Sequence, residues 1–357
     1  MQSGFSRGNT GTLRAVSLSL FLQRVAAGEN LSAEDAHRAM SVILEGGASE
    51  TALAGFLMAL RMKGETAGEL AGFARAMREH AVRVDAGDDL IDTCGTGGDG
   101  AGTFNISTVA AIVMAGAGAR VAKHGNRSIT SKTGGSAEMV EALGVRFAMT
   151  AEEAACAVRE VGIGFLFAPH MHPAMKHAQH VRRELGVRTV FNLLGPLANP
   201  ARAQAQLIGA PSREAAKLMA EALAELGTRH AFVVHGHDGL DEISISGTTE
   251  VYEVRGGRIQ RMSWTPSDFG VSCAGIESIA GGGPERNAEI ALAILGGESG
   301  ARREIVLMNA AAGLVAAGVA RDLKVGMRAA AESIDSGAAS EKLKKLRERW
   351  PYDKASP

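Results

Sequence analysis

Residues 91–136 have the sequence IDTCGTGGDGAGTFNISTVAAIVMAGAGARVAKHGNRSITSKTGGS, in which glycines, hydroxyl side chains and cations follow one another closely. Its second half holds five basic side chains and no acidic one, although the whole chain has a formal net charge of only −1. Positive charge beside glycine-rich backbone favours anion binding through cations and amide groups. The stretch therefore predicts a phosphate-binding cradle.

The first half of this stretch contains Gly95, Gly97 and Gly100 directly after a predicted strand. Taken alone, this G-x-G-x-x-G spacing is a weak dinucleotide signal, which requires an acidic residue at the end of the second strand. Here the second strand ends in Lys123-His124, and no G-K-[ST] closes the glycine run as a P-loop would require. The predicted helix begins near Asn105, so its free amide groups face the glycine loop and favour phosphate. A plain strand-to-helix turn is the alternative.

Two further polar clusters also follow predicted strands. Residues 123–131 come after the second strand and so belong to the same carboxyl edge of a parallel sheet, where ligands bind. The acidic run 238–242 follows a later strand, and adjacent carboxylates facing phosphate favour a shared Mg²⁺. The alternatives are a solvated charge run and a surface turn. Histidines at positions 170, 172, 177 and 180 match no metal-ligand spacing, so no zinc site is predicted.

The whole-chain composition limits the class of protein. With 357 residues, 46% hydrophobic and 22% charged, the chain is long enough for one small and one large globular domain. A net charge of −1 argues against a general nucleic-acid binder. Three widely spaced cysteines favour neither a disulfide framework nor a zinc site, and they indicate a reducing, cytoplasmic compartment. No apolar run is long enough to span a membrane.

The order of predicted elements indicates an α/β fold with two domains. Residues 1–14 are predicted to be a flexible tail, and residues 15–83 a small α-helical domain of four amphipathic helices. A polar linker leads to a large α/β domain over residues 90–350, in which a central, mainly parallel sheet is flanked by helices. The strands are expected at residues 90–93, 119–122, 163–167, 204–209 and 230–234.

Five ordered motifs together resemble the anthranilate phosphoribosyltransferase family. They are GTGGD (95–99), NIST (105–108), KHGNR (123–127), HPAMKH with VRRELGVRTVFNLLGPLANP (172–177 and 181–200), and GLDEIS (239–244). The resemblance implies that helices from about 174–200 complete the helical domain, and that the chain forms a homodimer through this domain. It implies transfer of the 5-phosphoribosyl group from 5-phosphoribosyl 1-pyrophosphate (PRPP) to the amine of anthranilate, for tryptophan synthesis, with Mg²⁺ as cofactor and no nucleic-acid or membrane partner.

The resemblance also implies the site residues. Mg²⁺ would be held by Ser107, Asp241 and Glu242, and anthranilate by Gly95, Asn126 and Arg182. Lys123 would act electrostatically, and no residue would act as a covalent nucleophile. The implied PRPP contacts are Gly95, Gly98, Asp99, Thr103, Asn105, Ile106, Ser107, Thr108, Lys123, His124, Gly125, Asn126, Arg127, Ser128, Ile129, Thr130, Ser131 and Gly135.

Two positions depart from the family pattern. The segment SKTGGSAEMVEALG carries one residue more than the family's usual SKSGSADVLEALG, so either Gly135 or Ser136 occupies the expected phosphate contact. His180 stands where the family usually has proline, which bears on the path to Arg182.

Two other functions are compatible with parts of the sequence. A pyrimidine nucleoside phosphorylase shares the architecture, and TGGSAEMVEALG faintly resembles a segment of that group. Phosphorolysis needs no metal-pyrophosphate clamp, so the pair Asp241-Glu242 argues against it. A non-catalytic phosphoribosyl or nucleic-acid binding module would be expected to lose the acidic pair or the NIST residues, and both are present.

Overall fold

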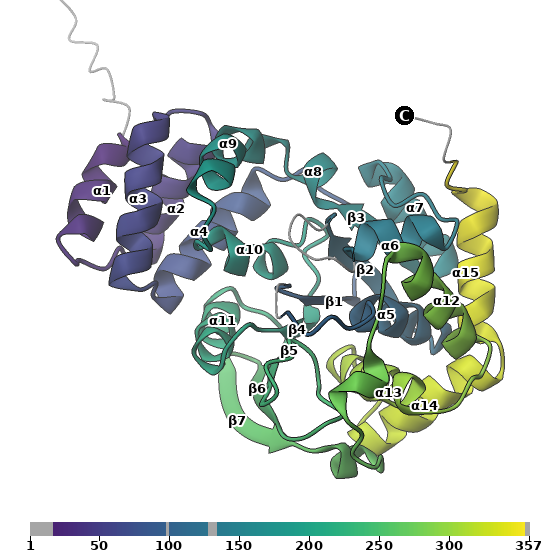
Figure 1. Ribbon diagram of the computed structural model, residues 1–357. Coiled ribbons are helices and arrows are strands. Elements are labelled where there is room, and N and C mark those ends of the chain that lie inside the picture. The colour runs from purple at the N-terminus through teal and green to yellow at the C-terminus, as the bar shows by residue number, and fades with distance from the viewer. Residues whose placement is uncertain (1–16, 98–99, 128–133, 354–357) are drawn as a thin grey trace, which may run out of the picture.

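The structure is a computed structural model that describes residues 17–97, 100–127 and 134–353. The predicted flexible tail, residues 1–14, lies outside the described residues. Figure 1 shows a helical part built from the N-terminal helices and from α9 and α10, beside a larger part in which helices surround a sheet. The predicted fold class, a small helical domain with a large α/β domain, is confirmed.

Four helices begin the helical part: α1 (Leu18–Ala26), α2 (Ala33–Leu44), α3 (Glu50–Lys63) and α4 (Ala67–Glu79). Each begins after a serine or threonine whose side-chain oxygen accepts a backbone N–H of the first turn, at Ser17, Ser32, Ser49 and Thr66. Such caps satisfy amide groups that the helix itself leaves without a partner. The sequence therefore sets all four starts locally.

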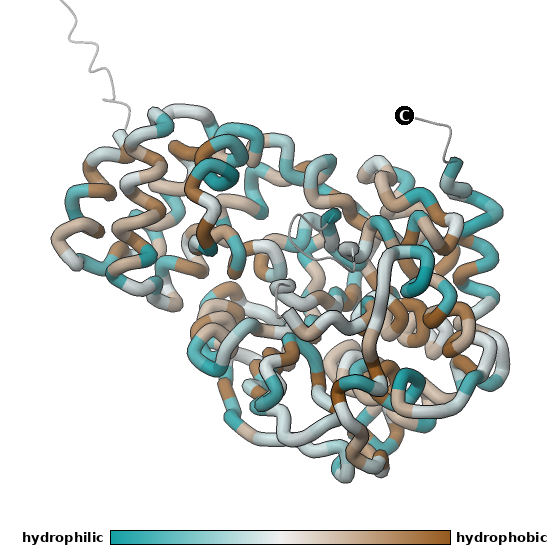
Figure 2. The backbone as a smooth tube through the Cα atoms, in the orientation of Figure 1, coloured by the Kyte–Doolittle hydropathy of each residue, from teal (hydrophilic) through white to brown (hydrophobic). Residues whose placement is uncertain are grey.

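A later segment returns to these helices. It comprises α8 (Ala168–Met171), a short 3₁₀ helix (Pro173–Met175), α9 (Lys176–Leu185) and α10 (Phe191–Leu197). Helix α9 contacts α2 and α3, and α10 contacts α4. Figure 2 shows that hydrophilic residues cover much of α9, so this helix buries only a narrow apolar stripe, made by Ala178 and Val181.

The sheet has seven strands in the order β3-β2-β1-β4-β5-β6-β7. Five are parallel: β1 (Leu90–Gly95), β2 (Arg120–Gly125), β3 (Ile163–Phe167), β4 (Ala205–Gly209) and β5 (His230–Gly236). All five were expected; four have bounds within two residues of the expected ones, and β2 ends three residues beyond the expected 119–122. Strands β6 (Thr249–Arg255) and β7 (Arg258–Trp264) are antiparallel and were not predicted. Their hairpin turns at Gly256 and Gly257, which both have positive φ, and such a Gly-Gly pair is a recognisable hairpin signal.

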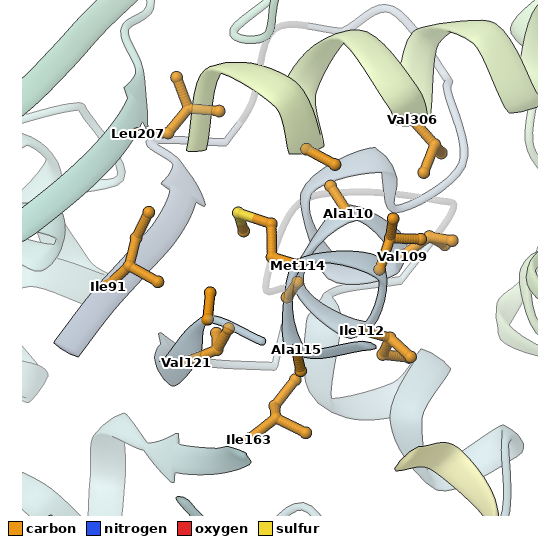
Figure 3. Close-up of a cluster of buried hydrophobic side chains, with 14 of the residues drawn as sticks. Ile91, Val109, Ala110, Ile112, Met114, Ala115, Val121, Ile163, Leu207 and Val306 are labelled. Atoms are coloured by element: carbon orange, nitrogen blue, oxygen red, sulfur yellow. The ribbon is translucent and has the colours of Figure 1, made fainter. Parts of the chain in front are cut away.

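Helix α5 (Ile106–Gly116) lies at the centre of the larger core, because nearly every one of its side chains is buried. Figure 3 shows Val109, Ala110 and Met114 of this helix between two sets of side chains. On one side is Ile91 of β1, and on the other is Val306 of α13. The other helices around the sheet are α6 (Ser136–Ala142), α7 (Ala151–Val161), α11 (Arg213–Glu225), α12 (Pro284–Leu295), α13 (Ala301–Ala316), α14 (Leu323–Asp335) and α15 (Ala338–Arg349).

The two parts are joined by polar connections that also touch each other. Val82 donates a backbone hydrogen bond to Met171, and Val84 donates one to Pro200. Within the described chain, the only non-glycine residues with positive φ are Asp89 and Arg202, one in each connection that enters the sheet. No helix among the described residues is long and apolar enough to cross a bilayer.

Candidate active site

The carboxyl ends of β1 and β4 form the floor of the candidate site. Gly95 and Gly209 lie opposite each other in the register of these strands, and Asp241 crosses over both. A Cβ atom on Gly209 would overlap the backbone carbonyl of Asp241, and one on Gly95 would lie 2.8 Å from the Asp241 carboxyl carbon. Only glycine fits at both positions, so the acidic loop lies directly against the glycine loop.

The two predicted metal carboxylates are buried and held by backbone amides. Asp241 is 7% exposed and accepts the N–H of Gly97 at 2.7 Å, whereas Glu242 is 8% exposed and accepts the N–H of Ser107 at 3.2 Å. The pair thus bridges the glycine loop and the first turn of α5. Asp238 has another role, because it accepts the Ser244 hydroxyl at 2.6 Å and shapes the acidic loop itself.

The N-terminal end of α5 faces these carboxylates. Asn105 is its N-cap residue but makes no side-chain capping bond; its side-chain oxygen instead accepts the amide of Asn287 on α12 at 3.0 Å. Thr108 is buried, and its hydroxyl has no hydrogen-bond partner. The Ile106 side chain is buried in the core, so only the backbone of Ile106 could contact a ligand. Thr103 pairs with Ala280 in an isolated β-bridge. Sequence patterns gave no signal for Asn287.

Lys123 reaches the same place from β2. Its ammonium group donates to the Thr93 carbonyl at 2.5 Å and to the Ser107 hydroxyl at 3.4 Å, and only 2% of the residue is exposed. Burial lowers the pKa of this amine, while the charges of Asp92 and Glu242 oppose that shift. The cation is therefore fixed behind the serine that is predicted to bind the metal.

His124 and His172 form a neutral aromatic pair beside this loop. Their ring centres are 5.1 Å apart, and the buried Nε2 atom of each has no hydrogen-bond partner in the structure. Burial lowers the pKa of His124 to about 3 and that of His172 to about 4. His124 Nδ1 lies 3.2 Å from the Gly195 carbonyl of α10. The histidine-rich run offered a signal for His172, but its spacing did not separate this residue from its neighbours.

A buried carboxylate supports the second loop from below. Asp92 accepts the backbone N–H of His124 at 3.1 Å and the side-chain amide of Asn199 at 2.8 Å. Burial raises the pKa of Asp92 to about 6, although the nearby Lys123 charge works in the opposite direction. Asn199 also donates to the Ala122 carbonyl at 2.9 Å. These positioning residues were not predicted, because they are 107 residues apart.

The rest of the second loop is only partly described. Arg127 pairs with Glu141 at 2.6 Å, and its backbone N–H donates to the Asn126 side chain at 2.8 Å. Gly125 has no room for a Cβ atom beside the Ser136 hydroxyl. Of the predicted PRPP contacts, Gly98, Asp99, Ser128, Ile129, Thr130 and Ser131 lie outside the described residues.

The alternatives Gly135 and Ser136 both have local partners. Gly135 is the N-cap of α6, and its N–H donates to Glu138 at 3.0 Å. The Ser136 hydroxyl donates weakly to the Asn126 carbonyl at 3.4 Å. Neither contact decides which of the two residues would meet a phosphate, so this assignment stays a prediction.

On the helical side, Arg182 of α9 stacks its guanidinium over the Phe191 ring, 4.8 Å from the ring centre. Burial lowers its pKa. His180, the departure from the family pattern, lies 3.4 Å from Glu184 on the exposed face of α9. A second arginine was not predicted: the Arg188 side chain donates a hydrogen bond to the Gly97 carbonyl of the glycine loop.

The donor set suits a hard cation shared with a substrate. Carboxylate and hydroxyl oxygens are the ligands that Mg²⁺ prefers, and it usually takes some of its ligands from phosphates and water. Among the described residues, no three His, Cys, Asp or Glu side chains gather to hold a metal ion by themselves. Asp241 and Glu242 therefore fit an ion that arrives with a phosphate-bearing ligand.

Comparisons with known proteins agree with this geometry. A model of the glycosyl transferase family a/b domain matches residues 87–340, and one of the helical bundle domain of the same family matches residues 20–81. Anthranilate phosphoribosyltransferase of Solibacter usitatus is 59% identical over 93% of this chain and 98% of its own length. The one from Symbiobacterium thermophilum is 52% identical over 93% and 97%.

Solved structures give the same result. The crystal structure of anthranilate phosphoribosyltransferase from Thermus thermophilus matches with a TM-score of 0.87 and 44% identity, over 92% of this chain and 98% of that one. The Saccharomyces cerevisiae enzyme in complex with PRPP and Mg matches with a TM-score of 0.84 and 32% identity, over 93% and 97%. The family resemblance inferred from the motifs is confirmed.

Proposed function

The chain belongs to the anthranilate phosphoribosyltransferase family, and we propose that it transfers the 5-phosphoribosyl group of PRPP to the anthranilate amine. The products are N-(5-phosphoribosyl)anthranilate and pyrophosphate, and the reaction belongs to tryptophan biosynthesis. The observation that carries this proposal is the buried pair Asp241-Glu242, held against the glycine loop and the first turn of α5. This arrangement suits a divalent cation that is shared with an anionic leaving group, because the carboxylates alone would repel that group.

The residues of this chain would act on the leaving group. Breaking the bond at the anomeric carbon leaves negative charge on pyrophosphate, so groups that stabilise that charge lower the barrier. Lys123, which lies behind Ser107, and the positive end of the α5 dipole supply fixed positive potential. Asp241, Glu242 and Ser107 would hold Mg²⁺, which supplies further neutralisation of the pyrophosphate when it is bound.

The acceptor needs orientation more than activation. An aromatic amine is already neutral near pH 7, so it requires no strong base before it attacks. The planar guanidinium of Arg182 suits the anthranilate carboxylate, because it can donate two parallel hydrogen bonds. His124 and His172 carry no charge at neutral pH, so they offer the anthranilate carboxylate no competing salt bridge.

We also propose two domains: a helical domain of residues 15–83 completed by residues 174–200, and an α/β domain of residues 90–350. The chain would form a homodimer through the helical domain. Leu20 on α1 and Met62 on α3 are 57% and 81% exposed, and these two helices pack against each other. Exposed apolar residues on adjacent helices favour burial against a second copy.

The three cysteines are free thiols, which supports the proposal of a cytoplasmic location.

A direct assay tests the reaction. Purified protein is mixed with anthranilate, PRPP and Mg²⁺, and the decay of anthranilate fluorescence is followed. The double substitution Asp241→Ala with Glu242→Ala should abolish turnover while the thermal unfolding midpoint changes little, and Glu298→Ala, an exposed acid elsewhere, serves as the control. No decay with the unmodified chain would reject the proposal. Metal-independent cleavage of a pyrimidine nucleoside would favour a phosphorylase instead.

A further inference from the structure

Arg188 joins the helical part to the glycine loop. It lies in the exposed loop between α9 and α10, and its backbone carbonyl accepts a hydrogen bond from the side chain of Arg61 on α3. Its own side chain extends the other way and donates to the Gly97 carbonyl. One residue is thus anchored by its backbone on the helical side and reaches the α/β side with its guanidinium.

The Gly97 residue is held on both of its polar groups. Its N–H donates to the Asp241 carboxylate at 2.7 Å, and its carbonyl accepts from Arg188. Gly97 has a φ of 73°, in the left-handed region, so the loop adopts a conformation that favours glycine. A continuous series of hydrogen bonds therefore leads from α3 through Arg188 and Gly97 to the acidic pair.

The base of Arg188 is itself fixed. The next residue, Thr189, donates its backbone N–H to the Asn192 side chain at 3.0 Å. Farther along the same segment, the Gly195 carbonyl lies 3.2 Å from His124 Nδ1. The segment from Arg188 to Gly195 thus contacts both loops that are predicted to bind PRPP.

We propose that Arg188 is a positioning residue, which aligns Gly97 and Asp241 for the pyrophosphate side of the reaction when the helical part is in place. This inference rests on the proposed function. A cation bound to a carbonyl polarises the peptide group, and hydrogen bonds in series strengthen one another. Loss of the guanidinium would therefore loosen the Gly97 loop and the carboxylate that it orients.

The test compares Arg188→Met with Arg183→Met. Arg183 is exposed on the neighbouring helix, and its side chain shares a hydrogen bond with His180 of the same helix. We expect Arg188→Met to lower kcat/KM for PRPP roughly 10-fold and to raise the half-saturating Mg²⁺ concentration several-fold. The KM for anthranilate should stay within about twofold, and Arg183→Met should match the unmodified chain.

Two further variants sharpen the test. Arg188→Lys keeps one cationic donor and should recover part of the loss. Arg61→Met removes the anchor of the Arg188 backbone, and its effect should disappear in the double variant with Arg188→Met, because both act through one series of contacts. Calorimetric titration of PRPP with Mg²⁺, without anthranilate, should show weaker binding to Arg188→Met.

Several results would overturn the inference. The inference is refuted if Arg188→Met has unchanged kinetics, or if its only effect is on the KM for anthranilate. It is also refuted if the effects of Arg61→Met and Arg188→Met are additive. A loss confined to anthranilate would make Arg188 a direct acceptor contact. The activity of the unmodified chain distinguishes failure of this inference from failure of the proposed function. If the unmodified chain converts anthranilate and Arg188→Met is equally active, only the role of Arg188 is refuted.

Discussion

Replacing Gly95 by alanine should specifically disturb the Asp241 carboxylate. The φ of Gly95 lies outside the positive region, so the backbone itself tolerates a side chain. The added Cβ atom, however, would lie 2.8 Å from the Asp241 carboxyl carbon, a distance that real Cβ atoms essentially never show. The carboxylate is the mobile end of a short side chain and would move first, away from the Gly97 N–H.

The size of the effect follows from the contact that is lost. A hydrogen bond to a charged group contributes about 1.5–3 kcal/mol, more than a neutral one. If the transition state requires Asp241 in its present position, this loss lowers kcat/KM for PRPP roughly 10- to 150-fold. Because the same carboxylate is proposed to hold Mg²⁺, the half-saturating Mg²⁺ concentration should rise as well.

The assay is anthranilate fluorescence decay at several Mg²⁺ and PRPP concentrations, with thermal unfolding as a check on folding. Gly247→Ala is the matched control, because a Cβ atom there meets no atom within 4 Å and φ is not positive. It should leave both quantities unchanged. Full activity of Gly95→Ala with the Mg²⁺ dependence of the unmodified chain would refute the reasoning that Asp241 must lie against the glycine loop.

Three other predictions follow from separate features. From pH 6.5 to pH 4.5 the free energy of unfolding should fall by about 1.4 kcal/mol per pH unit. His124 and His172 have lowered pKa values in the folded chain, so the unfolded chain binds two more protons at these histidines. The raised pKa of Asp92 makes the folded chain bind one more proton there, which leaves a net difference of one. Urea unfolding at both pH values measures this; stability that rises toward pH 4.5 would contradict it, and His172→Gln should flatten the slope. Asn287→Ala should remove the hydrogen bond that orients Asn105 and so lower kcat/KM for PRPP about fivefold, with little change in the KM for anthranilate. An effect on the KM for anthranilate alone would argue against Asn105 as a PRPP contact. Met62→Lys should shift the chain toward monomers in light scattering, with Lys324→Met as a remote control, and an unchanged mass would place the dimer interface elsewhere.

Much of the fold and of the site could be predicted because the motifs stand at strand ends. Strands β1 and β2 are parallel, so their carboxyl ends share one edge, and the glycine loop, Asn105 and Lys123 must meet there. Helix starts also carry local signals, since a capping residue such as Thr66 acts within its own first turn.

What sequence patterns missed depends on side-chain direction and on long-range contact. Asn199 reaches Asp92 across 107 residues, and Arg188 reaches Gly97 across 91. Periodicity assigns a residue to a face of a helix or strand, but it does not indicate where a polar group in a loop will point. The hairpin of β6 and β7 was missed for another reason: β7 is mostly exposed, so its charged residues give no continuous apolar run.

The two hydrophobic cores limit how the site can open. The side chain of Leu207 on β4 packs into the larger core, whereas that of the adjacent Ile208 packs into the core of the helical part, together with α11. Helix α4 packs against α11, so moving the helical part away would expose this apolar surface to water. The contacts at Arg188 and Gly97 are single hydrogen bonds at an exposed loop, and they separate at much lower free energy. When the two parts separate, the Arg188–Gly97 contact should therefore break before the packing of α4 against α11.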